Sequence, residues 1–154
     1  MPIFCHKHDT FASVSSRSAV LLDAVVSIGC RAEEGFTSPT YRQLQSRVRD
    51  HLTNLLINNT TPSVEDIQAI TLVAAYSENG FVLIALALRF AMQLGLPQAV
   101  DRLVAGSRDR SGGISPEEKE LYRLCRIWHG ICNLELLCVK REYPMMLRTR
   151  LTVP

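Results

Sequence analysis

The chain has 154 residues and a formal net charge of +2, with 47% hydrophobic and 21% charged residues. This length fits one domain, and this composition excludes an intrinsically disordered chain. The small net charge gives no indication of nucleic-acid binding, and no region has the order of segments found in a signal peptide, so we expect an intracellular, cytoplasmic protein. The five cysteines are odd in number and do not make a disulfide framework at this length, and none form the C-x-x-C pair of a zinc site. We expect no metal site and no cofactor.

The first third of the chain contains two predicted helices behind a polar end. Residues 1–15 are irregular in pattern, and we expect them to be a flexible N-terminus, with structure beginning near residue 16. A mostly buried helix is predicted over residues 17–31. Ser38 can then cap an amphipathic surface helix that begins with Pro39 and ends near Ile57.

The stretch from residue 63 to residue 96 contains two helical patterns that meet at a Ser-Glu-Asn-Gly turn. Ser63 can cap the first pattern, which extends to Tyr76. The second, residues 81–94, is apolar on nearly every face and stops at Gly95, so we interpret it as the central core helix. Its apolar run is shorter than the ~18–20 residues of a membrane span, so we expect no membrane insertion.

The last third contains a short predicted helix, residues 98–104, then a glycine-rich loop and the strongest helix start in the chain. At that start Ser115 and Glu118 can form a capping box. The helix should end where a basic C-terminal tail, residues 139–154, begins, because Pro144 breaks any helix there.

Five or six helices with short connections predict an all-α fold of antiparallel helical hairpins over residues 16–138. No G-x-S-x-G or H-E-x-x-H motif is present. His129 and Glu135 are six positions apart, which places them about 120° out of phase on one helix, so they should not converge in a catalytic cleft. We therefore expect no catalytic residue and no enzyme activity.

Glu135 is the polar residue of most interest, because it shares a helix face with Trp128, where an unpaired carboxylate is costly. Arg89 and Arg126 are its candidate partners. Two interpretations remain open for these residues, a buried ion pair and a ligand-binding site.

Three segments resemble, in order and spacing, the middle homology region of fungal zinc-cluster transcription factors. That region contains a Q-A-x-x-L run ending near a tyrosine, a helix of the form GLAIRLALDLGLH, and an RRLWW-x-L-Y-x-L-D segment. The corresponding stretches here are SVEDIQAITLVAAY, ALALRFAMQLGL and CRIWHGICNLEL. The matched positions are Gln68, Ala69, Leu72, Tyr76, Ala87, Arg89, Ala91, Leu94, Gly95, Leu96, Arg126, Trp128, Leu134 and Glu135. His129 and Cys132 stand where the family has aromatic residues, and the family's six-cysteine zinc cluster is missing.

The resemblance implies a non-enzymatic regulatory domain of a nuclear factor, part of a larger α-helical domain. Such a domain modulates transcription through protein contacts or by binding a small-molecule inducer. Without the zinc cluster, it implies no direct DNA contact by this chain. A domain shortened in this way should expose apolar surface, which predicts a protein partner or self-association. The alternative is a generic helical adaptor that binds another protein in a groove between hairpins.

Overall fold

The computed structural model describes residues 3–58, 60–77, 80–106 and 114–150, with the backbone alone from residue 139 onward. These residues form seven α-helices and no strand, so the predicted all-α class is confirmed, with one or two helices more than expected. The helices are α1 (Phe11–Arg17), α2 (Ala19–Glu34), α3 (Pro39–Ile57), α4 (Val64–Ala75), α5 (Gly80–Gln93), α6 (Leu96–Gly106) and α7 (Pro116–Arg150).

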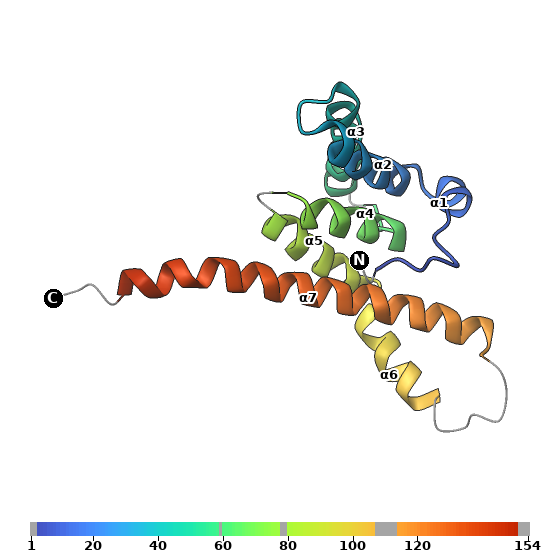
Figure 1. Ribbon diagram of the computed structural model, residues 1–154. Helices are drawn as coiled ribbons and strands as arrows, with labels where there is room; N and C mark the ends of the chain where they lie inside the picture. Colours follow the sequence, from blue (N-terminus) through green and yellow to red (C-terminus); the bar gives the residue numbers. More distant parts are fainter. Residues whose placement is uncertain (1–2, 59, 78–79, 107–113, 151–154) are drawn as a thin grey trace.

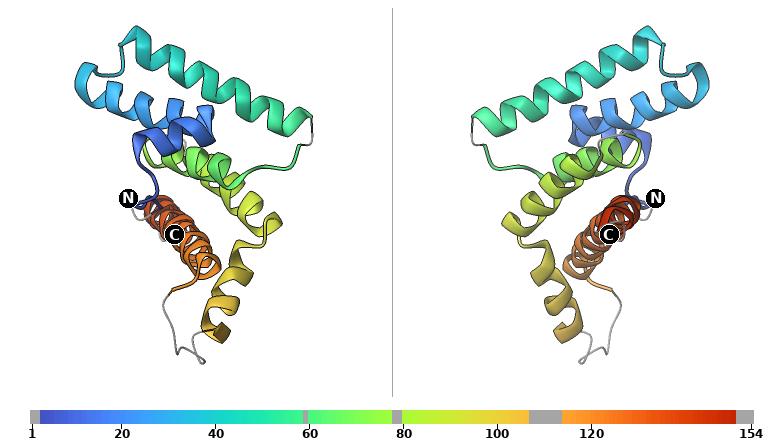
Figure 2. Two further views of the ribbon diagram at one scale, coloured as in Figure 1. Left: turned by 90° about the vertical axis from the view of Figure 1, so that its right-hand side faces the viewer. Right: turned by 90° about the vertical axis from the view of Figure 1, so that its left-hand side faces the viewer.

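The helices stack in the spatial order α3, α2, α4, α5, α7, α6, and each contacts the next (Figures 1 and 2). Consecutive helices therefore form three packed pairs, α2 with α3, α4 with α5, and α6 with α7, while α1 lies against α2. Short connections favour this pairing of neighbours along the chain.

The centre of the stack is α4, and the expectation that the helix at residues 81–94 is the central one is wrong. Residues 66–74 of α4 are all buried, because α2 covers one side of this helix and α5 the other. In α5 the buried side chains form only a narrow stripe that includes Ile84, Ala87 and Ala91. Val82 on the same helix is 57% exposed. An apolar composition therefore does not decide which helix is enclosed, because that depends on how many neighbours cover it.

The three predicted helix caps, at Ser38, Ser63 and Ser115, are confirmed. In α4, the hydroxyl of Ser63 accepts a hydrogen bond from the backbone N–H of Asp66, whose carboxylate accepts one from the Ser63 N–H at 2.8 Å. Ser115 and Glu118 form the same reciprocal pair at the start of α7, with distances of 3.0 and 3.1 Å. The hydroxyl of Ser38 caps α3. These caps satisfy backbone donors that have no partner within a helix.

The break between α5 and α6 is a bend rather than a hairpin. Gly95 has φ +75° and ends α5 in the left-handed conformation that glycine adopts without strain. The axes of the two helices differ by only 53°, so they do not reverse direction, which corrects the expectation that all consecutive helices are antiparallel. In the described part of the chain no single helix is long and apolar enough to span a membrane; α5 and α6 meet that length and composition only when counted together across the bend.

Helical structure begins earlier than expected, at Phe11 rather than near residue 16. Thr10 caps α1, its hydroxyl accepting a hydrogen bond from the N–H of Ser13 at 3.3 Å. Ser18 both ends α1 and caps α2. The polar composition of this end hid the helix, because the polar side chains here serve as caps and ion-pair partners.

Helix α7 also continues beyond its expected end and includes Pro144. A proline removes one backbone donor and crowds the preceding turn, which can bend a helix without ending it. The expectation that Pro144 excludes a helix in residues 139–154 is therefore wrong for residues 139–150. In Figure 1 this part of α7 extends past the other helices.

Candidate functional site

The N-terminal segment, residues 3–10, packs between α4 and α7. Ile3 is only 1% exposed, and its carbonyl accepts a hydrogen bond from Nε2 of Gln68 at 2.9 Å. A Cβ atom at Gly130 of α7 would overlap Cγ2 of Ile3, so the isoleucine occupies a notch that glycine leaves open. The segment is thus seated on the core by one apolar side chain and one backbone hydrogen bond.

Asp9 anchors the other end of this segment. Its side chain is 2% exposed and accepts two hydrogen bonds, one from the backbone N–H of Cys5 and one from the guanidinium of Arg17, each at 2.7 Å. A buried carboxylate that is paired in this way avoids most of the cost of leaving water. The contact fixes the segment to α1.

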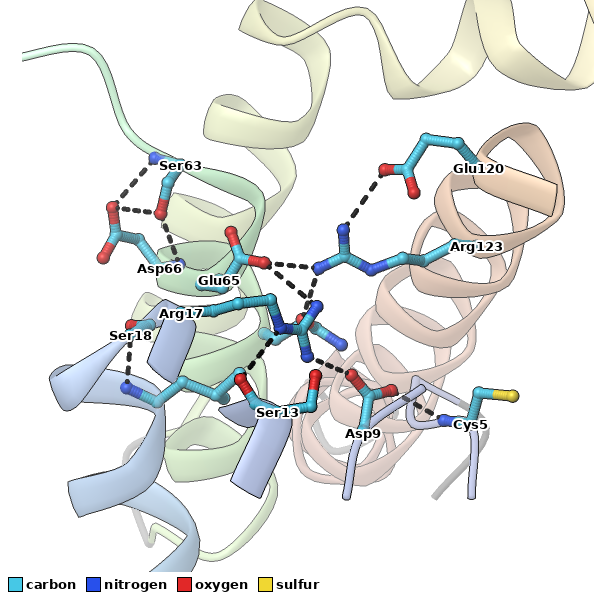
Figure 3. Close-up of polar contacts among 12 residues, drawn as sticks. Cys5, Asp9, Ser13, Arg17, Ser18, Ser63, Glu65, Asp66, Glu120 and Arg123 are labelled. Atoms are coloured by element: carbon cyan, nitrogen blue, oxygen red, sulfur yellow. Dashed lines mark hydrogen bonds and ion pairs between the residues drawn. The ribbon is translucent and has the colours of Figure 1, made fainter. Parts of the chain in front are cut away.

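A chain of alternating charges continues from Asp9 across the molecule (Figure 3). Arg17 also contacts Glu65 of α4 at 3.3 Å, and Glu65 contacts Arg123 of α7 at 2.6 Å. Arg123 in turn donates to Oε1 of Gln68 at 3.2 Å. Arg123 also contacts Glu120, one turn earlier on α7, at 3.2 Å. The N-terminal segment, α1, α4 and α7 are therefore joined by one polar network with three acidic and two basic groups.

An apolar cavity of about 320 Å³ lies beside this network. Its walls come from the N-terminal segment, α1, α2 and α4. The lining residues are Phe4, Asp9, Phe11, Val14, Leu22, Val25, Ile28 and Leu72. The volume is at the lower end of the range of roughly 300–1,000 Å³ found for small-molecule sites.

The lining of the cavity offers van der Waals contact rather than acid–base chemistry. Asp9 is the one ionisable residue among the described residues of the lining, and its carboxylate is already engaged by Arg17 and Cys5. A ligand that fits this surface is small and apolar or aromatic. In the described part of the chain, no three His, Cys, Asp or Glu side chains come close enough together to hold a metal ion.

Three residues that the sequence singled out have different environments. Gln68 is fully buried and belongs to the network beside the cavity. Trp128 is partly buried and packs against the core. Tyr76 is exposed at the end of α4, where its carbonyl accepts a hydrogen bond from Arg31 and its ring lies 5.9 Å from that guanidinium. Only Gln68 of the three belongs to the candidate site.

The predicted ion pair of Glu135 with Arg89 or Arg126 is wrong for the described residues. Arg89 is exposed, and Arg126 lines a cavity together with Cys5. Oε2 of Glu135 is buried without a hydrogen-bond partner. Helical spacing placed Glu135 on a partly buried face, but it did not show which cation lies opposite.

Sequence reasoning missed Asp9, Arg17 and Arg123 and gave Glu65 only a role at the start of a helix. Only a weak indication of these contacts is present in the sequence, namely that Arg17 and Asp9 are eight positions apart in the polar N-terminal end. No local pattern pairs Glu65 with Arg123, since 58 positions separate them.

The chain was compared with known proteins. It matches no protein-family model, no curated protein and no solved structure.

Proposed function

We propose that this protein is a non-enzymatic regulatory module that binds a small apolar molecule in the cavity under its N-terminal segment. The observation that carries the proposal is the cavity itself, whose lining is almost wholly apolar. The transcriptional setting, a nuclear location and the role of the ligand as an inducer come from the resemblance of three helical segments to the regulatory region of zinc-cluster transcription factors.

The position of the cavity couples occupancy to the N-terminal segment. One wall contains Phe4 of the N-terminal segment and Phe11 of α1. The other wall contains Leu22 and Ile28 of α2 and Leu72 of α4. A ligand that contacts both walls stabilises the seated position of the segment relative to any displaced one. A protein that contacts this end of the molecule then meets the segment in its seated position when the ligand is bound.

Binding can be tested with prodan, a neutral naphthalene dye whose fluorescence depends on its surroundings. Val25 lines the cavity, and Val26 is its neighbour on α2 outside the lining, with nearly the same exposure. Val25→Trp should fill the cavity and abolish dye binding, and Val26→Trp should leave it intact. Equal binding by the two variants, or no binding by the unmodified chain, would contradict the proposal.

The regulatory role needs a separate test. A fusion of the chain to a heterologous DNA-binding domain should change the output of a reporter gene, and Val25→Trp should alter its response to apolar compounds. A reporter that responds to neither the chain nor the compounds would remove the transcriptional part of the proposal while leaving ligand binding untouched.

The alternative, a helical adaptor, is favoured by one observation. Helix α5 exposes Phe81, Val82 and Met92, three large apolar side chains. A surface of this kind suits a protein partner or a second copy of the chain. Light scattering during size-exclusion chromatography should then detect an assembly that Val82→Ser weakens, with no dependence on apolar compounds.

A further inference from the structure

A second cavity, of about 430 Å³, lies between the N-terminal segment and α7. It differs from the apolar one in charge. The side chains that matter for its chemistry are Cys5, Lys7, His8, Lys119, Tyr122 and Arg126. The three residues from α7 are spaced by three and four positions, which places them on one face of that helix.

The described residues in the wall of this cavity carry positive charge. Lys7, Lys119 and Arg126 all line it, and no Asp or Glu is found among the described residues of its wall. No ion pair joins any of these three cations to a carboxylate in the described part of the chain. Like charges that converge unpaired raise the energy of the site, and a bound anion relieves that repulsion.

The thiol of Cys5 reports the same positive potential. Cys5 and Arg126 both line the cavity. The guanidinium of Arg126 has the largest effect in lowering the pKa of the Cys5 thiol, and the backbone of Lys7 and His8 acts in the same direction, against the opposing effect of burial. The wall of the cavity therefore stabilises negative charge at a known atom.

We propose that this cavity binds a compact polyanion, one carrying two or more charged oxygens, between Lys7 of the N-terminal segment and Lys119 and Arg126 of α7. The planar guanidinium of Arg126 suits two parallel hydrogen bonds to a phosphate or carboxylate, and the two ammonium groups add charge without a fixed direction. The bound anion joins the N-terminal segment to α7 through these three cations. This inference does not depend on the apolar ligand or on a role in transcription.

Cys5 provides a natural reporter for the test. The full chain is treated with iodoacetamide, a neutral reagent that reacts with the thiolate, and the modification of each cysteine is followed by peptide mass spectrometry. Pyrophosphate or citrate is added at constant ionic strength adjusted with sodium chloride. A bound anion offsets the positive charge of Arg126 and covers the sulfur, so the alkylation rate of Cys5 should fall several-fold. The rate at Cys30, on α2, should not change.

The two anions separate the possible ligand classes. Protection by pyrophosphate alone assigns a phosphate compound, and protection by citrate alone assigns a polycarboxylate. Protection by both assigns a site for either class. Absence of protection by both, or the same slowing with sodium chloride in place of the anion, would overturn the proposal.

Variants test whether the protection of Cys5 arises from anion binding in this cavity. Lys119→Gln removes a charge from an exposed side chain that does not contact the thiol, so it should raise the half-protecting concentration roughly tenfold, the scale of one charge-assisted contact. Arg42→Gln, an exposed site on α3, is the matched loss of charge and should change nothing. Arg126→Gln also slows alkylation of the Cys5 thiol directly. Anion binding by this variant is therefore measured by titration calorimetry with pyrophosphate or citrate, where it should be lost. Equal protection in Lys119→Gln and Arg42→Gln would refute the assignment to this cavity.

Discussion

Glu65 of α4 and Arg123 of α7 lie 2.6 Å apart, and this ion pair joins two helices that otherwise make few contacts. Arg17 approaches the same carboxylate from α1 at 3.3 Å. Both partners of the pair are largely buried, with side-chain exposures of 13% for Arg123 and 17% for Glu65. The pair therefore carries more of the folding free energy than a surface contact of the same length.

Arg123→Met should destabilise the protein by about 3 kcal/mol, because it leaves Glu65 with one cation and removes the donor to Gln68. The matched control is Arg47→Met. Arg47 contacts Asp23 at a similar distance of 3.0 Å but is 59% exposed, so its loss should cost no more than about 1 kcal/mol. Urea unfolding monitored by circular dichroism measures both, and equal losses would show that burial of the pair contributes nothing.

Gly130→Ala tests how the N-terminal segment is seated. The added methyl group would overlap Cγ2 of Ile3, so the substitution should displace the segment and lower the free energy of unfolding. Gly29→Ala, within α2, meets no atom and should stabilise the protein by about 0.5–1 kcal/mol through helix propensity.

The double substitution Ile3→Ala/Gly130→Ala separates the clash from any other effect at Gly130. Removing the larger side chain at position 3 should restore part of the stability lost in Gly130→Ala, measured by urea unfolding. If the separate effects of Ile3→Ala and Gly130→Ala on the free energy of unfolding simply add in the double variant, Ile3 and Gly130 are not coupled.

The parts of the fold that could be predicted depend on local chemistry. A cap needs a hydroxyl or carboxylate within three positions of the backbone donors, so Ser63 and Ser115 were found from the sequence. The most enclosed helix was misidentified because α4 is buried by α2 and α5 on opposite sides, a property of the assembled stack. The extension of α7 through Pro144 was missed because proline weakens a helix at one turn without ending it.

The candidate site was harder to predict because its contacts join distant parts of the chain. Gln68 donates to a carbonyl 65 positions away and accepts from a side chain 55 positions away. Periodicity placed Gln68, Glu135 and Trp128 on particular helix faces, but it carries no information on which element packs opposite. Charged residues were consequently assigned to the wrong partners, and the cavity under the N-terminal segment was not expected.

The thiols should differ in the pH at which they react. The guanidinium of Arg126 has the largest effect in lowering the pKa of Cys5, whereas burial raises the pKa values of Cys125 and Cys132. Because the thiolate is the reactive form, Cys5 should reach half of its maximal alkylation rate below the ordinary thiol pKa of about 8.5. Cys125 and Cys132 should reach theirs above it. Peptide mass spectrometry across a pH series gives the three midpoints, and a Cys5 midpoint at or above the other two would contradict the effect of Arg126 on this thiol.

Trp128 and His129 are neighbours on α7 with opposite environments, which makes them a matched pair for testing how this helix packs. Trp128 is partly buried against the core, so Trp128→Ala should cost about 3 kcal/mol, the lower end of the range for removing a core aromatic side chain. His129 is exposed, so His129→Ala should change stability by no more than about 0.5 kcal/mol. Urea unfolding of both variants measures the difference. A loss below about 1 kcal/mol for Trp128→Ala would place the indole at the surface, because a large apolar side chain that contributes so little is not enclosed. The packing of α7 would then rest on its other apolar side chains, among them Ile127 and Ile131, which are both fully buried.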